Sequence, residues 1–199
     1  MFKRLVASFA VLGAAASLAG LGTFATFTSS TSASQSIQSG TVSITLGATG
    51  PANRLTIGAS NVVPGDTIER AVDLINNGSA SADDLSSIQL TTTASPSSLL
   101  DTDATNGLQM VIDACSVPWT EAGPPFTYTC SGATSSVLAS RAVIGANIAL
   151  SNLTSLTTGS TDHLRVTLTL PSVAGNTLQG LSSSISYTFV GTQRAGTSK

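Results

Sequence analysis

Charged side chains are scarce in this sequence. They make up 9% of the 199 residues, against about 25% in a typical soluble domain. The few Lys and Arg residues are scattered along the chain, whereas binding to phosphate groups requires them in clusters. This argues against nucleic acid or an anionic membrane as a partner. It also means that little electrostatic repulsion keeps two copies of the protein apart.

Histidine occurs once, at His163. The common zinc proteases need two His residues at positions i and i+4 of a helix, with a Glu between them as the base. His163 instead lies beside Arg165 on the polar face of a predicted strand, which favours an exposed cross-strand partner over a lone catalytic or metal-binding residue. A Gly-x-Ser-x-Gly motif is also missing. We therefore predict no catalytic residue, no metal ligand and no cofactor.

Motifs for binding ions or phosphates are missing or incomplete. The segment 101–107 resembles the start of a calcium loop, but Asn106 and Ile112 stand where the EF-hand pattern needs Gly and Glu. An acidic turn explains this segment better than a weak calcium site. The pair 83–84 is interpreted as a solvated turn or a short helix cap.

Only two cysteines are present, Cys115 and Cys130. In an exported chain, an even count predicts one disulfide bond. The bond would close a loop of about 15 residues and stabilise the fold by about 3 kcal/mol. The loop carries Trp119, Phe126 and Tyr128, which form either a small core beneath the loop or a contact patch for a glycan or a protein.

Long apolar runs are limited to one, Leu5–Leu21, which follows Lys3 and Arg4. A positive end, an apolar stretch and small residues after it are typical of a signal peptide. A retained membrane anchor is the competing interpretation. Removing the leader leaves six basic against ten acidic residues, a net charge of −4.

The predicted cleavage lies between Ala25 and Thr26, with an alternative at 20–22. After cleavage the protein is expected to be secreted and free of the membrane, with signal peptidase as its partner during export. The predicted organisation is a signal peptide at 1–25, a flexible arm at 26–38, a β-sandwich at 39–190 and a flexible tail at 191–199.

Short strands with alternating apolar and polar residues dominate the rest of the chain. The clearest alternation covers 164–170. Other predicted strands lie at 42–46, 55–57, 67–75, 85–93, 108–114, near 128 and at 185–189. One helical turn is predicted at 97–101 and a short helix at 135–141, and the apolar segment at 143–153 is ambiguous. The pattern predicts an all-β protein, an antiparallel β-sandwich of jelly-roll or Greek-key type preceded by the signal helix.

Several motifs, in order along the chain, resemble the TasA/camelysin family of exported bacterial proteins. The motifs are Gly22-Thr23-Phe24-Ala25, Ser39-Gly40-Thr41-Val42, Pro64-Gly65-Asp66, Asn76-Asn77-Gly78-Ser79, Leu178-Gln179-Gly180 and Ile185-Ser186-Tyr187-Thr188-Phe189. The resemblance implies a jelly-roll subunit of biofilm-matrix fibres, processed by a dedicated signal peptidase. Camelysin itself is described as a surface metalloprotease, but no zinc motif is present here to receive that activity.

The resemblance also gives the arm 26–38 an expected function. In fibre-forming members, the N-terminal arm of one subunit completes a sheet of the next, and here Phe27 and Ile37 would be its apolar anchors. The expected partners are other copies of the chain or other matrix proteins. A camelysin-like metalloendopeptidase and a monomeric adhesin that binds through Trp119 are the alternatives.

Overall fold

The computed structural model describes residues 43–56 and 62–196, which belong to one compact unit, Ser39–Lys199. These residues form antiparallel sheets that pack together, so the prediction of an antiparallel sandwich is confirmed in that form. The signal helix, the cleavage residues Ala25 and Thr26, and the arm residues Phe27 and Ile37 lie outside the described residues.

The larger sheet has five strands in the order β1-β2-β9-β4-β7. Its strands are β1 Ile44–Leu46, β2 Thr67–Asn76, β9 Thr161–Thr169, β4 Gln109–Cys115 and β7 Thr134–Ala142. β9 pairs with β2 over nine residues and with β4 over seven, so the pairing is continuous through the middle of this sheet.

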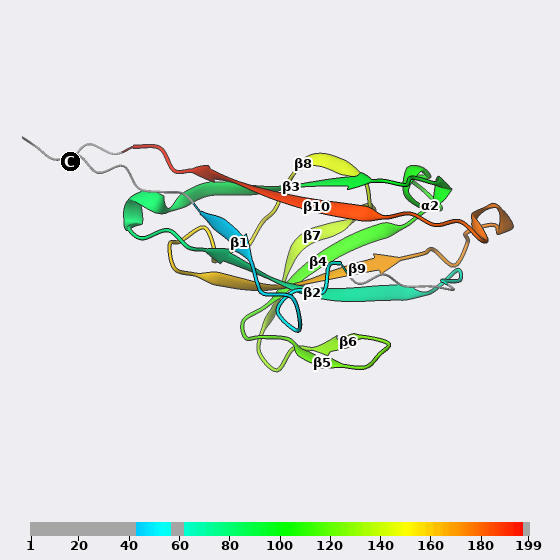
Figure 1. The fold of residues 1–199 in the computed structure, drawn as a ribbon, viewed down its shortest axis with the longest axis horizontal. Helices are drawn as coiled ribbons and strands as arrows, with labels where there is room; N and C mark the ends of the chain where they lie inside the picture. The colour runs from blue at the N-terminus through cyan, green and yellow to red at the C-terminus, as the bar shows by residue number, and fades with distance from the viewer. Residues whose placement is uncertain (1–42, 57–61, 197–199) are drawn as a thin grey trace, which may run out of the picture. The chain divides into compact units, whose positions relative to one another are not determined.

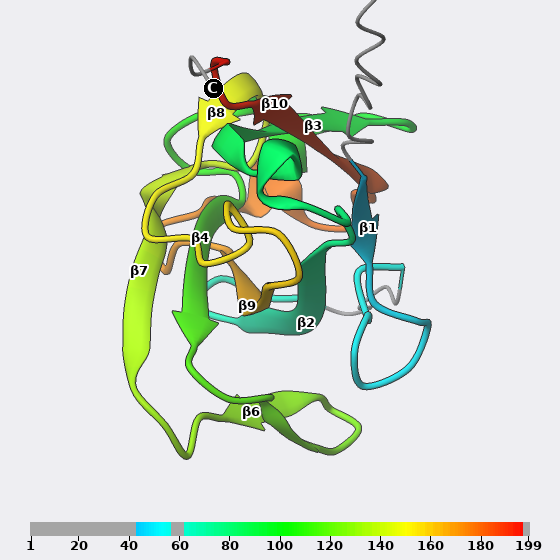
Figure 2. The same ribbon diagram turned by 90° about the vertical axis from the view of Figure 1, so that its left-hand side faces the viewer.

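The smaller sheet has three strands in the order β10-β3-β8 and lies over the larger one (Figure 1). Its strands are β10 Ile185–Gln193, β3 Leu85–Ala94 and β8 Gly145–Ala149. A two-stranded ribbon of β5 Thr120–Ala122 and β6 Thr127–Thr129 lies on the opposite side of the five-stranded sheet (Figure 2). The described chain therefore has three layers.

Alternation along each central strand builds the core between the two sheets. Every second residue of β9 is buried from Asp162 to Val166, and β4 alternates in the same way. The largest fully buried side chains are Leu74, Ile88, Leu90, Met110, Ile112 and Leu164. The other residues of these strands face outward and are free to form a site.

Short helical turns connect the sheets: η1 Ser81–Asp83, α2 Leu99–Thr102 and η2 Asn176–Leu178. The turn predicted near 97–101 is confirmed as α2, which begins with a capping box. Ser98 Oγ accepts from the N–H of Leu100 at 3.1 Å, and the Asp101 carboxylate accepts from the N–H of Ser98 at 2.7 Å.

Among the described residues, no helix is long and apolar enough to cross a membrane.

The short helix predicted at 135–141 is wrong, because this segment is part of strand β7. The pairing of β7 with β4 is irregular there, since Ile112 lies opposite Leu138 while Asp113 lies opposite Ser136. The extra residue, Val137, is left without a partner in the register and is buried. This bulge removes the period of two by which a strand is recognised in a sequence.

Two other segments differ from the predictions. Leu55 lies in a turn and not in a strand, while Ile57 lies outside the described residues. The last strand continues to Gln193, three residues into the predicted tail. The ambiguous apolar segment at 143–153 contains the short strand β8.

Candidate functional site

A cluster of charged side chains lies on the outer face of the five-stranded sheet. Alternation turns Glu69 and Asp73 of β2 away from the core, together with His163 and Arg165 of β9 and Asp113 of β4. The register sets Asp73 opposite His163, and Asp113 opposite Arg165. Opposite charges on neighbouring strands, here those of Asp113 and Arg165, stabilise the pairing of those strands.

Arg165 lies at the centre of this cluster. Its Nη1 donates to Glu69 Oε1 at 3.2 Å, and its Nη2 donates to Asp113 Oδ2 at 3.1 Å. Its Cζ lies 4.5 Å from the centroid of the Trp119 ring, which is a cation–π contact. One guanidinium thus binds a carboxylate on each neighbouring strand and is covered by an indole.

The ribbon β5–β6 is fastened over this face by a disulfide bond. The bond between Cys115 and Cys130 is confirmed, with the two Cα atoms 5.8 Å apart. Cys115 is the last residue of β4, and its position in the alternation turns its side chain to the outer face of the sheet. The bond therefore holds the two ends of the loop that contains the ribbon against that face. Trp119 adds a second attachment, because its Nε1 donates to the His163 carbonyl at 2.8 Å.

Phe126, at the tip of the ribbon, packs between two cations. Its ring centroid lies 4.9 Å from Cζ of Arg54 and 5.5 Å from Cζ of Arg70. Arg54 comes from the loop that follows β1, and Arg70 comes from β2. The tip is therefore attached near the β2 side of the sheet, far along the ribbon from the disulfide bond.

Glu121 links the ribbon to the loop after β1. Arg54 donates to both of its carboxylate oxygens, at 2.7 and 2.9 Å, and Tyr128 Oη donates to it at 3.0 Å. The hydrogen bond from Arg54, which outweighs the effect of burial, holds the pKa of Glu121 below its usual value. Burial, together with the bond to Glu121, raises the pKa of Tyr128. Glu121 is thus ionised at neutral pH, and Tyr128 keeps its proton.

The three predicted aromatic residues therefore have structural contacts of their own. The rings of Trp119 and Phe126 pack against guanidinium groups. Tyr128 is buried, with 6% of its surface exposed. Its backbone N–H donates to Glu69 Oε2 at 3.1 Å. These contacts attach the ribbon to the sheet. A contact patch for a glycan or a protein stays a prediction.

His163 lies across from Asp73, with Nδ1 and Oδ1 2.7 Å apart. The sequence favoured an exposed cross-strand partner; the cross-strand contact is present, but the His163 side chain is only 19% exposed. Among the described residues, no group of three or more His, Cys, Asp and Glu side chains is placed to hold a metal ion. The segments outside the described residues contain none of these four residue types, so they add no such ligand.

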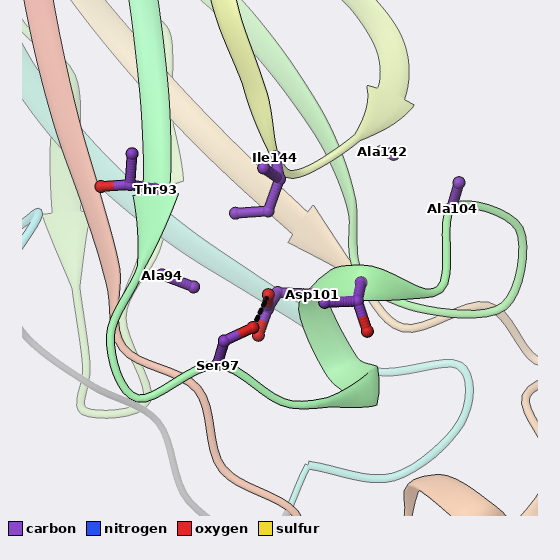
Figure 3. Close-up of a pocket in the computed structure, with 8 residues that line it drawn as sticks. Thr93, Ala94, Ser97, Asp101, Ala104, Ala142 and Ile144 are labelled. Carbon is purple, nitrogen blue, oxygen red and sulfur yellow. Dashed lines mark hydrogen bonds between the residues drawn. The ribbon is translucent and has the colours of Figure 1, made fainter.

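The larger of the two best-defined cavities, about 450 Å³, lies between the end of β3, helix α2 and the turn that joins β7 to β8 (Figure 3). It is lined mostly by small side chains, including Ala94, Ala104 and Ala142. Asp101 is its one ionisable residue, and both carboxylate oxygens are engaged, by Ser97 and by Ser98 and Ser183.

The second cavity, about 250 Å³, borders the disulfide bond and Asp162. The Asp162 carboxylate accepts from the N–H groups of Thr154 and Ser155, each at 2.8 Å. In both cavities the carboxylate is used to hold a loop. Neither cavity brings a nucleophile to a free base, which acyl-transfer chemistry requires.

The acidic segment 101–107 contains the last two residues of α2 followed by a turn. Asp103 Oδ1 accepts from the N–H groups of Thr105 and Asn106, at 3.0 and 2.9 Å. These bonds hold the pKa of Asp103 below its usual value. Asp101 faces a different set of partners, so the two carboxylates do not act together.

Strand β10 has an open edge. Within residues 43–56 and 62–196 it pairs only with β3, over its full nine residues. Its core-facing residues Ile185, Tyr187 and Phe189 are only partly buried, although they pack against the core. Burial nevertheless raises the pKa of Tyr187 to about 12. This edge has both unpaired backbone and incompletely covered apolar side chains.

The other sheet edges are shorter or partly covered. β1 has three residues and β8 has five. The edge of β7 is blocked at Ser136 and Val137, whose carbonyls accept from Asn152 Nδ2 and from the Ser151 N–H. Among the described strands, β10 therefore has the longest continuous edge open to another chain.

Sequence reasoning missed the charged residues that attach the ribbon, namely Glu69, Arg54, Arg70, Asp113 and Glu121. These residues come from three strands and one loop, and they meet only when the chain is folded. The only signal in the sequence was the polar face of the β9 strand, with His163 and Arg165 two residues apart.

One comparison with known proteins gave a match. The family of camelysin metallo-endopeptidases matches residues 1–113, and no curated protein matches the chain. The matched segment contains no histidine and no cysteine. It ends within β4, so the ribbon, the disulfide bond and His163 all lie beyond it.

The metal that this family name implies does not fit the residues of this chain. His163 is bound to Asp73, and no third ligand joins them within the part of the chain that the structure describes. The carboxylates of Glu69 and Asp113 are bound by Arg165 instead, and that of Glu121 is bound by Arg54. The match nonetheless covers more than half of the sequence, and the chain therefore belongs to the camelysin metallo-endopeptidase family.

Proposed function

We propose that this chain is a secreted, non-enzymatic structural protein that assembles into extracellular fibres by strand exchange. In the proposal, the N-terminal arm 26–38 of one subunit pairs with an open sheet edge of the next. The single observation that carries the proposal is the edge of β10, whose nine residues pair with β3 alone among the described strands. Head-to-tail addition of this kind does not close on itself and so produces a filament.

The side chains of β10 fit an added strand. Ile185, Tyr187 and Phe189 alternate along its core-facing side and are only partly covered. In an extended arm, Phe27 and Ile37 would point to the same face, because they are an even number of residues apart. Both could then pack against the core next to β10. The arm is also longer than β10, so it can cover the whole edge.

The disulfide bond supports export, because such bonds persist in oxidising compartments. Cleavage between Ala25 and Thr26 would release the arm as the new N-terminus. The mass of the secreted protein measures this directly. A secreted form that retains residues 1–25 would contradict the proposed cleavage.

Deletion of 26–38 tests the assembly. Negative-stain electron microscopy should show filaments from the secreted protein and none from the deleted variant, while circular dichroism shows the same β-sheet content for both. Filaments from the deleted variant, or no filaments from the intact protein, would contradict the proposal.

A matched pair of variants tests the anchors within the arm. Replacing Phe27 and Ile37 with Ser should reduce filament formation strongly, because it removes the apolar contacts next to β10. Replacing Thr28 and Ser36 with Ala changes the opposite face of the arm and should leave assembly intact. Equal effects of the two variants would argue against an ordered inserted strand.

A metalloendopeptidase is the second candidate, and the family match favours it. It predicts a stoichiometric metal ion in the purified protein and peptide hydrolysis that a chelator abolishes. Elemental analysis and a protease assay on the same sample separate the two candidates. A bound metal with chelator-sensitive activity would overturn the non-enzymatic assignment.

A further inference from the structure

The outer face of the three-stranded sheet is a regular array of hydroxyl groups. Alternation turns every second residue of β3 and β10 outward, and the register sets them in cross-strand pairs. We define the hydroxyl face by three of these pairs: Thr93–Ser186, Thr91–Thr188 and Ser87–Thr192. Between them lies the pair of Gln89 and Val190. No described helix or strand lies over this face (Figures 1 and 2).

No charged residue occurs on β3 or β10. The charged residues nearest to them in the sequence are Asp84 and Arg194, which lie together at one end of the face, where the Arg194 N–H donates to the Asp84 carbonyl at 2.9 Å. Solvent-facing sheets normally carry charges, which discourage association with other molecules. This face has none, while the outer face of the other sheet carries the charged cluster.

Hydroxyl groups make the face complementary to a second copy of itself. Each Ser or Thr hydroxyl can donate one hydrogen bond and accept others. Two such faces related by a two-fold axis can therefore satisfy each other. Val190 is 50% exposed and would be covered in that arrangement. The two charged outer faces would then point away from each other, which keeps the repulsion between two acidic molecules low.

The area of the face decides how strong this contact is. Strands rise about 3.3 Å per residue and lie about 4.8 Å apart, so β3, β10 and β8, with ten, nine and five residues, together cover about 400 Å². Two facing copies would bury about 800 Å², below the roughly 1,200 Å² of a stable complex. Isolated copies should therefore pair only weakly. Many copies aligned along a filament would act together and pair strongly.

We propose that the hydroxyl face is the lateral contact through which filaments of this protein pair side by side. This rests on the filament assembly proposed above, since the contact becomes strong only when it is repeated. The partner is a second copy of the chain that presents the same face. The arm and β10 provide growth along the filament, and the hydroxyl face provides association between filaments.

The test uses Thr188→Lys in the secreted protein. Thr188 is exposed on β10, and across a two-fold axis the new ammonium groups of two faces would repel each other. We expect filaments of unchanged thickness that are at least about tenfold less often paired in electron micrographs. Thr120→Lys is the matched control, because Thr120 is exposed on the ribbon at the opposite side of the sandwich. Its filaments should pair as those of the unchanged protein do.

The outcomes separate the two proposals. Filaments of Thr188→Lys that pair normally, or filaments of the unchanged protein that are always single, would overturn the lateral contact while leaving the assembly proposal standing. If the unchanged protein forms no filaments, the assembly proposal fails, and the lateral contact fails with it. If Thr188→Lys does not fold, as judged by circular dichroism, Thr192→Lys on the same face takes its place and has the same expected result.

Discussion

Buried carboxylates hold the loops of this protein in place. Asp83, Asp101 and Asp162 are each less than 5% exposed. All three accept hydrogen bonds from backbone N–H groups of the loops around them. A buried carboxylate is stable only when such donors surround it. These three carboxylates therefore order the loops in which they lie.

The hydrogen bonds to Asp101 predict that the folded protein loses stability in acid. Burial by itself raises the pKa of this carboxyl, but hydrogen bonds from Ser183, Ser97 and Ser98 outweigh it and hold the pKa below its ordinary value. The native state therefore favours the ionised form, and its stability is complete above the ordinary pKa of about 3.9 and is lost as the pH falls below that value. Asp101→Asn should be about 1–3 kcal/mol less stable at pH 7.

Urea unfolding at several pH values measures this effect. The difference between Asp101→Asn and the unchanged protein should shrink as the pH falls from about 5 to about 2. Ser183→Ala is the control that removes one donor and keeps the carboxyl group. It should raise the pH at which stability is lost. A difference that stays constant with pH would show that Asp101 acts only through its shape.

The contacts of Arg165 predict that replacing this residue lowers the free energy of unfolding. Arg165→Met removes the cation from Glu69 and Asp113 and removes the contact with the Trp119 ring. The side chain is 23% exposed, so solvent weakens these interactions, and we expect a loss of about 1–2 kcal/mol in unfolding free energy.

The matched control for this prediction is Arg141→Met. The side chain of Arg141 donates to the Ala142 carbonyl at 3.4 Å and forms no carboxylate pair among the described residues. Its replacement should change stability by less than about 0.5 kcal/mol. Thermal unfolding of both variants, followed by Trp fluorescence, compares them directly. Equal losses would mean that the charged cluster contributes no more than an ordinary surface residue.

At the scale of elements, the ribbon β5–β6 is fastened at both ends. The disulfide bond holds its base, while Trp119 and Phe126 attach it to cations of the sheet and of the loop after β1. Replacing Cys115 and Cys130 with Ser should lower the free energy of unfolding by about 3 kcal/mol, because the loop spans 15 residues. The sandwich should remain folded, because the core between the two sheets does not include the ribbon.

Hydrogen exchange locates the effect of removing the disulfide bond. Amides of the ribbon should exchange faster, while those of β9 and β4 keep their protection under conditions in which the protein stays folded. Adding a reductant to the unchanged protein gives a matched sample with the same result expected. Loss of protection throughout the sandwich would mean that the bond is required for the whole fold.

Elements with a regular pattern were predictable from the sequence, and those set by distant contacts were not. The strand at Thr161–Thr169 was predicted because one of its faces is apolar and the other is polar. The strand β7 was missed because a bulge buries Val137 next to the half-buried Leu138. The charged cluster was missed for a related reason, since Arg165 meets Asp113 only after β4 and β9 pair, 52 residues apart.

At the scale of the whole molecule, charge is divided unequally between the two sheets. The five-stranded sheet and its ribbon carry Arg165, Glu69, Asp113 and Glu121, among others. The three-stranded sheet has no charged residue on β3 or β10. Assembly should therefore be controlled by the net charge of the molecule more than by specific ion pairs between copies.

This division predicts that assembly depends on pH. Residues 26–199 have a formal net charge of −4, and the isoelectric point of the full sequence is about 5.1. Lowering the pH from about 7 to about 5 reduces the negative charge and hence the repulsion between copies, so filament mass should rise. The fold should survive, because the pKa of Glu121 and that of Asp101 lie below their usual values and both groups stay ionised at pH 5.

Sedimentation of filaments at several pH values and salt concentrations measures this dependence. Added NaCl at pH 7 should act in the same direction as acid, because it screens the same repulsion. Thr188→Lys and Thr120→Lys each add one positive charge, so both should assemble along the filament slightly more readily at pH 7, although only the first disrupts side-by-side pairing. If salt instead dissolved the filaments, ion pairs between copies would have to hold the subunits together, and the uncharged edge of β10 would not be their main contact.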